Sequence, residues 1–256
     1  MVELEYAKRG LIGVLTPQAN ITVEPEFSIL LPAGVSMINA RLTSPKATIE
    51  DRMVDYRDQV EGSLHQFSNA PVQAVIFACT GASYLMGHEK EAELCDRIEK
   101  ARGYPLVTAA RAVTDYLSVL GAERIGLVSP YPASITKESI GYWEDAGFSV
   151  AEVAGVSNDS GDFHPIYVLR TENSMDALMS LKDKGIDAIV MLGTGMPTLQ
   201  PILNCANWNG PHVTSCMLSL AWRTMLYIDR KGASLDDMLA WSSGENWRQK
   251  LSAHGL

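Results

Sequence analysis

Short apolar runs alternate with longer stretches of helical periodicity along the chain. Four of the runs are rich in β-branched residues and are followed by Gly, Pro or Thr, which is typical of buried strands. These predicted strands are residues 11–15, 74–78, 124–129 and 188–192. Residues 35–42 are a fifth candidate strand.

The stretches between the predicted strands are amphipathic, and the clearest of them covers residues 48–67. Its apolar side chains recur every three or four residues, as on one face of a helix. They are Ile49, Met53, Tyr56, Val60, Leu64 and Phe67. Alternation of strands with helices implies a parallel sheet covered on both faces, so the pattern predicts an α/β fold.

The chain also repeats itself. Ile12-Gly-Val-Leu-Thr-Pro17 is similar to Ile125-Gly-Leu-Val-Ser-Pro130, and Ala74-Val-Ile-Phe-Ala-Cys-Thr-Gly81 is similar to Ala188-Ile-Val-Met-Leu-Gly-Thr-Gly195. A third, weaker pair is residues 103–108 and 210–214. The pairs keep one order and nearly one interval, which favours a duplicated unit, although parallel α/β units in general share such patterns.

The repeat predicts two flavodoxin-like parallel-sheet halves related by a pseudo-twofold axis. The expected halves are residues 1–118 and residues 119–256, and the C-terminal helix could cross back to the first half. Ligands of open parallel sheets bind beyond the carboxyl ends of the strands, so two facing halves would share one cleft. The loops at these strand ends are residues 16–22, 79–83, 129–134 and 193–198.

Composition narrows the class of protein. Hydrophobic residues make up 46% and charged residues 20%, which argues against disorder. A net charge of −9 disfavours nucleic acid as a partner, and no apolar run reaches the ~20 residues of a membrane span. Glu3 and Glu5 occur where a signal peptide would be basic and then apolar. A cytoplasmic protein is therefore expected, with homo-oligomer formation left open.

Cys79 is the candidate catalytic residue, because it follows a predicted strand and precedes a turn into a helix at Thr80-Gly-Ala-Ser83. Free amides and the helix dipole at such a position favour a thiolate and bind anions. The alternative is a small buried apolar residue. Its counterpart in the repeat is Gly193, so racemisation by two opposed thiols is disfavoured.

Polar groups near the predicted helix starts suit a substrate carboxylate or the oxyanion that forms from it. They are Thr80, Gly81, Thr194 and Gly195, with the phenol of Tyr131 at the end of the third of these strands. Each glycine and threonine could instead serve the turn or a helix cap.

The loop after the first strand offers Asn20, whose amide could bind a carboxylate or cap a helix beginning near Thr22. Pro17 and Gln18 in the same loop are candidate substrate contacts. Asn158, in a loop after a possible strand at 150–156, has weaker support.

Nothing in the sequence indicates a metal ion or an organic cofactor. The histidines lack metal-ligand spacing, and residues 193–198 are an incomplete dinucleotide-binding fingerprint. We therefore expect a cofactor-independent protein. The remaining cysteines are interpreted as structural, Cys95 and Cys216 in helical stretches and Cys205 in a loop.

Taken together, these motifs resemble the aspartate/glutamate racemase superfamily over residues 9–230. Within it, residues 80–87 and 114–131 look most like arylmalonate decarboxylase. Residues 17–26 are similar to a motif of maleate cis-trans isomerase. The resemblance implies the two-half fold with the active site in the cleft between the halves.

The resemblance also implies roles for single residues. Cys79 falls on the isomerase's nucleophilic cysteine, where the decarboxylase has glycine, and Gly193 falls on a second cysteine that both enzymes have. Thr80 and Tyr131 fall on a threonine and a tyrosine of the decarboxylase's dioxyanion hole.

Two further positions separate the enzymes. Gly81 replaces a serine of the decarboxylase's hole, and Asn20 falls on the isomerase's carboxylate-binding asparagine. The chain thus matches neither enzyme completely.

Three functions follow as hypotheses. A single neutral thiol could protonate the enediolate left by decarboxylation of a malonate-type acid, which the missing second thiol favours. Alternatively, a Cys79 thiolate could add to a cis-enedioate and isomerise it, which Asn20 and the position of Cys79 favour. A third possibility is a non-catalytic sensor that binds a small carboxylate. We slightly prefer decarboxylation, with a small dicarboxylic acid as the substrate.

Overall fold

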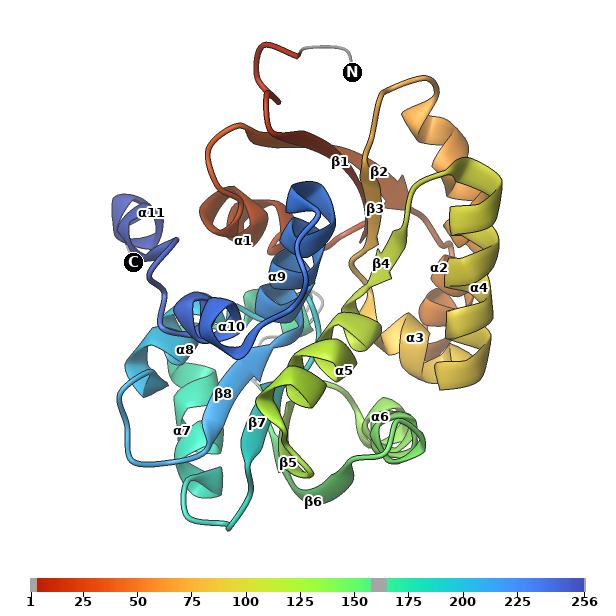
Figure 1. Cartoon of the computed structure of the whole chain (residues 1–256). Helices are drawn as coiled ribbons and strands as arrows, with labels where there is room; N and C mark the ends of the chain where they lie inside the picture. Colours follow the sequence, from red (N-terminus) through yellow and green to blue (C-terminus); the bar gives the residue numbers. More distant parts are fainter. Residues whose placement is uncertain (1–3, 158–164, 256) are drawn as a thin grey trace.

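Two four-stranded parallel sheets form the framework of the protein (Figure 1). The computed structural model describes residues 4–157 and 165–255. The first sheet has the order β2-β1-β3-β4, with β1 Gly10–Pro17, β2 Val35–Leu42, β3 Ala74–Phe77 and β4 Leu106–Thr108. The second has the order β6-β5-β7-β8, with β5 Arg124–Ser129, β6 Ser149–Gly155, β7 Ala188–Met191 and β8 His212–Ser215.

The two sheets confirm the predicted fold class. Counterpart strands hold the same place in each sheet, and the repeated motifs lie on β1 with β5 and on β3 with β7. β3 and β7 are buried along their whole length, which explains their unbroken apolar sequences. β2 and β6 are edge strands, and most of their residues are partly or fully exposed.

The helices of the first half cover its sheet and set the approach to the strand ends. They are α1 Val23–Leu30, α2 Ile49–Ser63, α3 Thr80–Met86, α4 His88–Arg102 and α5 Ala109–Leu120. α2 confirms the predicted helix, except that residues 64–67 tighten into a 3₁₀ turn. Thr48 begins α2, because its hydroxyl accepts a hydrogen bond from the Asp51 N–H.

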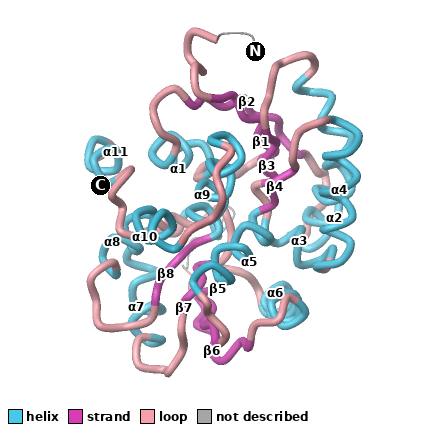
Figure 2. The backbone as a smooth tube through the Cα atoms, in the orientation of Figure 1, coloured by secondary structure: helices cyan, strands magenta, loops and turns pink. Residues whose placement is uncertain are grey.

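The second half repeats this arrangement and adds helices at its C-terminal end (Figure 2). Its helical segments are α6 Ala133–Asp145, the 3₁₀ turn η2 Pro165–Val168, α7 Thr171–Leu181, α8 Leu199–Cys205, α9 Cys216–Asp229, α10 Leu235–Ser242 and α11 Arg248–Ala253.

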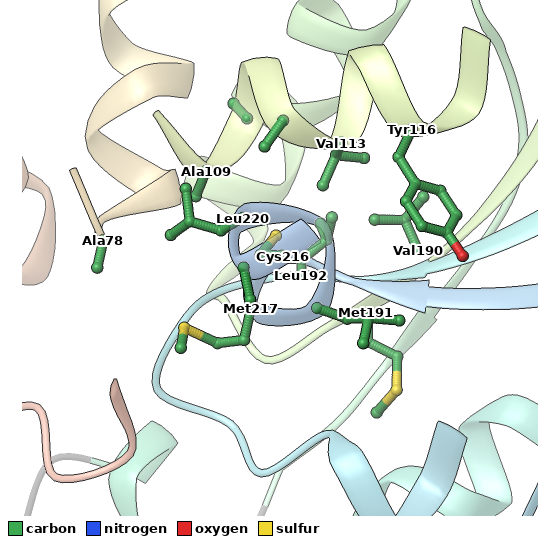
Figure 3. Packing of buried hydrophobic residues seen from close by; sticks show 14 of the residues in the cluster. Ala78, Ala109, Val113, Tyr116, Val190, Met191, Leu192, Cys216, Met217 and Leu220 are labelled. Atoms are coloured by element: carbon green, nitrogen blue, oxygen red, sulfur yellow. The ribbon is translucent and has the colours of Figure 1, made fainter. Parts of the chain in front are cut away.

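The C-terminal helices pack against the first half. α9 contacts α5, α1 and the strands β3 and β4, and α11 contacts α1. Figure 3 shows Ala109 and Val113 directed from α5 towards the start of α9. This shared core fixes how the strand ends of the two sheets face each other. The division of the chain at residue 118 stays a prediction.

Candidate active site

The strand-end loops of both sheets and one face of α2 enclose a cavity with about 470 Å³ of space free of protein atoms, part of it open to solvent. The first half contributes loop residues after β1 and β3, and the second half contributes loop residues after β5 and β7. The predicted site residues that line it are Pro17, Asn20, Cys79, Thr80, Tyr131, Thr194 and Gly195.

Cys79 lies between β3 and α3, as predicted, and is 4% exposed. Burial raises the pKa of its thiol to about 12, although a hydrogen bond from the Ala82 N–H to the sulfur lowers it. The expectation of a stabilised thiolate is therefore wrong: α3 has seven residues, and its one N–H bond to the sulfur does not offset desolvation. At neutral pH the thiol holds its proton.

Gly193, next to the cavity residue Thr194, has a backbone conformation that disfavours a side chain. Its φ is +83°, and a Cβ there would lie 3.0 Å from the Tyr131 hydroxyl oxygen. Tyr131 thus occupies the space that a side chain at position 193 would enter. Burial raises the pKa of this phenol, so it is a neutral hydrogen-bond donor, while its oxygen accepts from the Gly81 N–H.

The Thr80 hydroxyl is a second donor at the cavity wall. It is fully buried and has no nitrogen or oxygen partner among the described residues. Its neighbour is the thiol of Cys216, at the first position of α9. The hydroxyl can therefore turn towards a ligand in the cavity.

Cys216 was predicted to be a structural residue in a helical stretch, and it does lie in a helix. It is the first residue of α9 and is fully buried (Figure 3). Burial raises the pKa of its thiol to about 11, although hydrogen bonds from the Thr80 hydroxyl and the Gly193 N–H lower it. Cys205 differs from expectation, because it ends α8 rather than lying in a loop.

Asn20, Thr194 and Gly195 join the two halves. The Asn20 oxygen caps α1 by accepting from the Thr22 and Val23 N–H groups, while its Nδ2 donates to the Thr194 carbonyl over 3.2 Å. The Thr194 hydroxyl donates to the Ala78 carbonyl over 2.7 Å. The cap predicted as the alternative role of Asn20 is thus present, although the residue also borders the cavity.

A buried carboxylate holds the loop after β7. Glu26 on α1 accepts from the Thr198 N–H over 2.6 Å and from the Thr198 hydroxyl. Burial raises the pKa of Glu26 to about 7, against these hydrogen bonds. Thr22 supports the same loop by donating to the Gly195 carbonyl over 2.7 Å.

Two predicted contacts do not line the cavity, and a third cannot be placed. Gln18 does not line it, because its amide pairs at both ends with the Ser44 backbone, at 3.1 and 2.7 Å. Gly81 does not line the cavity either, and its N–H donates to the Tyr131 hydroxyl oxygen. A Cβ at Gly81 would overlap the Met53 sulfur. Asn158 lies outside the described residues.

Residues that the sequence did not single out as site residues complete the cavity. Ile49, Arg52, Met53 and Tyr56 share one face of α2 at helical spacing. Ala19 follows β1, and Ile166 and Tyr167 lie on η2. The periodic pattern of residues 48–67 was the available signal, but it was interpreted only as the apolar face of a helix.

Residues 4–157 and 165–255 contain no group of three or more His, Cys, Asp or Glu placed to hold a metal ion. Within the same residues, none of the helices has both the length and the apolar character to cross a bilayer.

Comparison with known sequences identifies the family. The sequence profile of the family described as arylmalonate decarboxylase matches residues 12–234, most of the chain. The chain belongs to the arylmalonate decarboxylase family. A curated member of similar sequence, a maleate isomerase from Nocardia farcinica, is 25% identical over 228 residues, which are 85% of this chain and 90% of the isomerase.

Solved structures share the fold of this decarboxylase-family chain. The Nocardia farcinica maleate cis-trans isomerase, in a mutant with a covalently bound succinylcysteine intermediate, matches with a TM-score of 0.76 and 22% identity, covering 86% of this chain and 93% of that one. A liganded arylmalonate decarboxylase mutant matches with a TM-score of 0.72 and 19% identity, covering 86% and 92%. In that mutant a glycine is replaced by cysteine and a cysteine by serine.

Proposed function

We propose that the protein is a cofactor-independent decarboxylase of a malonate-type dicarboxylic acid, with Cys79 as the proton donor. The observation that carries the proposal is the protonated, buried Cys79 thiol at a cavity in which Thr80 and Tyr131 present neutral hydroxyl groups. A neutral thiol is suited to donate a proton and poorly suited to add to a double bond.

The reaction begins with the retained carboxylate hydrogen-bonded by the hydroxyls of Thr80 and Tyr131. The bond from the α-carbon to the other carboxylate breaks, CO₂ leaves, and the electron pair forms an enediolate that these two donors stabilise. The Cys79 thiol then gives its proton to the α-carbon. Solvent reprotonates the resulting thiolate, so each turnover consumes one proton and releases one CO₂.

The apolar wall of the cavity supports loss of CO₂. Ile49 and Met53 on α2 and Ile166 on η2 face the same space as Cys79. A carboxylate placed against such side chains loses hydration, whereas CO₂ does not depend on hydration for stability. The leaving carboxylate is therefore assigned to this wall.

The arrangement of the thiol also supports decarboxylation. By the resemblance described above, the decarboxylase has glycine at position 79 and cysteine at position 193. The liganded decarboxylase mutant that gains one cysteine and loses another has an exchange of the same kind. Decarboxylation needs one proton donor, whereas isomerisation benefits from an acid on the face opposite the nucleophile, where this chain has Gly193.

Isomerisation of a cis-enedioate is the second candidate, favoured by Asn20 at the cavity and by the curated relatives, which are maleate isomerases. The isomerase mutant in which a cysteine is replaced by serine carries a succinylcysteine, so one thiol suffices for the adduct in that protein. Here Cys79 would have to lose its proton before adding to the double bond.

Proton NMR in deuterated water separates the candidates. We expect loss of CO₂ from phenylmalonate or ethylmalonate, with deuterium incorporated at the α-carbon, and no fumarate from maleate. Cys79→Ala should abolish turnover, while the matched variant Cys95→Ala, altered in the body of α4, should keep it. Fumarate formation would support the isomerase instead, and silence on every acid would favour the carboxylate sensor.

A further inference from the structure

Arg52 is the charged side chain among the described residues that line the cavity. It lies in the first turns of α2, on the face that it shares with Met53 and Tyr56. The same guanidinium borders the groove immediately outside, which also contains Ile49, Tyr131 and Ile166 from the cavity wall. Arg52 therefore lies at the mouth, between the reacting centre and solvent.

The hydrogen bonding of Arg52 is incomplete. Its Nε donates to the Lys46 carbonyl over 2.6 Å, and it forms no ion pair with a described residue. By contrast, Arg41 pairs with Glu24, and Arg57 pairs with Asp58. The terminal nitrogens of Arg52 thus keep their donors, in the forked geometry that fits a carboxylate.

Helix stability does not explain this arginine. A cation in the first turns of a helix opposes the helix dipole, which favours negative charge at that end. The acidic residues next to it do not neutralise it, and Glu50 instead accepts from Ser134 over 2.5 Å. The position costs stability locally, which points to a role in binding.

Two phenols connect Arg52 with the reacting centre. Burial raises the pKa of Tyr56 and of Tyr167. The charge of a Cys79 thiolate would raise both pKa values further, whereas the charge of Arg52 lowers them. Both rings line the cavity within electrostatic reach of Cys79 and of Arg52. A substituent that extends from the α-carbon to the mouth would lie along these rings.

We propose that Arg52 binds a carboxylate at the end of the substrate's substituent, separate from the two carboxylates on the reacting carbon. The inference rests on the proposed decarboxylation, because it places the α-carbon beside Cys79. Arg52 is not assigned to the leaving carboxylate, since stabilising that charge in the ground state would retard its loss. The substrate class is therefore a malonic acid whose side chain ends in a carboxylate.

The test compares two substrates that differ in charge and hardly in size, (2-carboxyethyl)malonate and (2-carbamoylethyl)malonate. We expect the wild type to favour the carboxylate by at least about tenfold in kcat/KM, the range of a charge-assisted Arg pair. Arg52→Met should remove this preference through KM. Arg52→Lys should keep part of it, because the charge remains while the fork is lost.

Arg57→Met is the matched control, because Arg57 lies on the same helix, pairs with Asp58 and does not line the cavity. It should leave the preference unchanged. Equal use of the two substrates by the wild type, or a preference that survives in Arg52→Met, would overturn the assignment.

Binding gives a readout that does not depend on turnover. Isothermal titration of Cys79→Ala with each of the two malonates should show the same charge preference, and adding Arg52→Met should abolish it. If neither malonate is decarboxylated by the wild type but the preference in binding holds, the proposed reaction fails and the role of Arg52 stands. If decarboxylation occurs without a preference, the role of Arg52 fails.

Discussion

The loop after β3 and the loop after β7 are counterparts in the repeat, yet they use equivalent positions differently. After β3, Cys79 and Thr80 line the cavity, and the Thr80 hydroxyl has no nitrogen or oxygen partner among the described residues. After β7, Gly193 has a φ of +83°, and the Thr194 hydroxyl is committed to the Ala78 carbonyl.

The two loops therefore have different roles, one in the chemistry and the other in supporting the first. Ala78 precedes Cys79 directly, so the hydrogen bond from Thr194 fixes the backbone that presents the thiol. Glu26 and Thr22 in turn hold the loop of Thr194 from the first half. One copy of the repeat supplies the reacting groups, and the other positions them.

The largest effect is expected at the thiol itself. Cys79→Ala should lower kcat/KM by about 10²–10⁴-fold, the usual contribution of a general acid. Steady-state kinetics measure it, with Cys95→Ala and Cys205→Ala as controls that keep near-native rates, because neither residue lines the cavity. Cys216→Ala is no control, since its sulfur contacts Thr80. Native activity in Cys79→Ala would contradict a chemical role for the loop after β3.

The two threonines test the comparison most directly. Thr80→Val should lower kcat by roughly 10²–10³-fold, as loss of an oxyanion donor does. Thr194→Val should lower kcat far less, and should instead cost about 1–2 kcal/mol of unfolding free energy by leaving the buried Ala78 carbonyl unpaired. Rates and urea denaturation of both variants decide the point. Equal kinetic losses would mean that both loops bind the substrate.

A thiol placed in the second loop should alter stereochemistry. The wild type is expected to protonate the enediolate from the Cys79 face and to give one enantiomer. Gly193→Cys puts a thiol on the other face and should lower the enantiomeric excess, and adding Cys79→Gly should invert the product.

Strain limits the rate of these two variants. A non-glycine residue at φ +83° costs about 1–2 kcal/mol of conformational free energy. Its Cβ would also lie 3.0 Å from the Tyr131 hydroxyl, so Tyr131 must move. We therefore expect rates about tenfold lower or worse. Chiral chromatography of the products is the measurement. One configuration regardless of thiol position would exclude Cys79 as the donor.

The smallest effect on catalysis concerns the support of the second loop. The pKa of Glu26 is raised from 4.5 to about 7, so the folded state holds this proton more tightly than the unfolded state. Its contribution to stability is complete below about pH 4.5 and is lost as the pH rises through about 7. Denaturation from acid to neutral pH should therefore show the wild type losing up to about 3 kcal/mol more than Glu26→Gln. Parallel curves for the two proteins would contradict this.

The fold could be predicted well because the central strands are easy to recognise in the sequence. β3 and β7 are buried throughout, so their sequences are unbroken apolar runs, and the repeat placed them in equivalent positions. β4 is shorter, with three residues, too few to show a period, so it entered only through the weak third pair of the repeat. The tight turn at 64–67 was taken as helix because it continues the same apolar face.

Site residues that follow strand ends could be predicted from the sequence. Site residues that reach the cavity through the packing of other elements were missed. Cys79, Thr80 and Tyr131 were found because they follow strand ends. Arg52 and Tyr167 were not, because the packing of α2 and η2 on the sheets brings them to the cavity. The sequence left the protonation of Cys79 open between a thiolate and a neutral thiol, because a helix start is a local feature, whereas burial depends on the whole fold.

The hydrogen bonds between the halves also govern how molecules enter and leave. Opening the cleft as a hinge would break the Thr194–Ala78, Asn20–Thr194 and Thr22–Gly195 bonds together, each at about 0.5–1.5 kcal/mol, and would disturb the α5–α9 core. Passage through the mouth beside Ile49, Tyr131 and Ile166 would leave these bonds intact. Substrate and product should therefore pass through this mouth while the two halves stay closed.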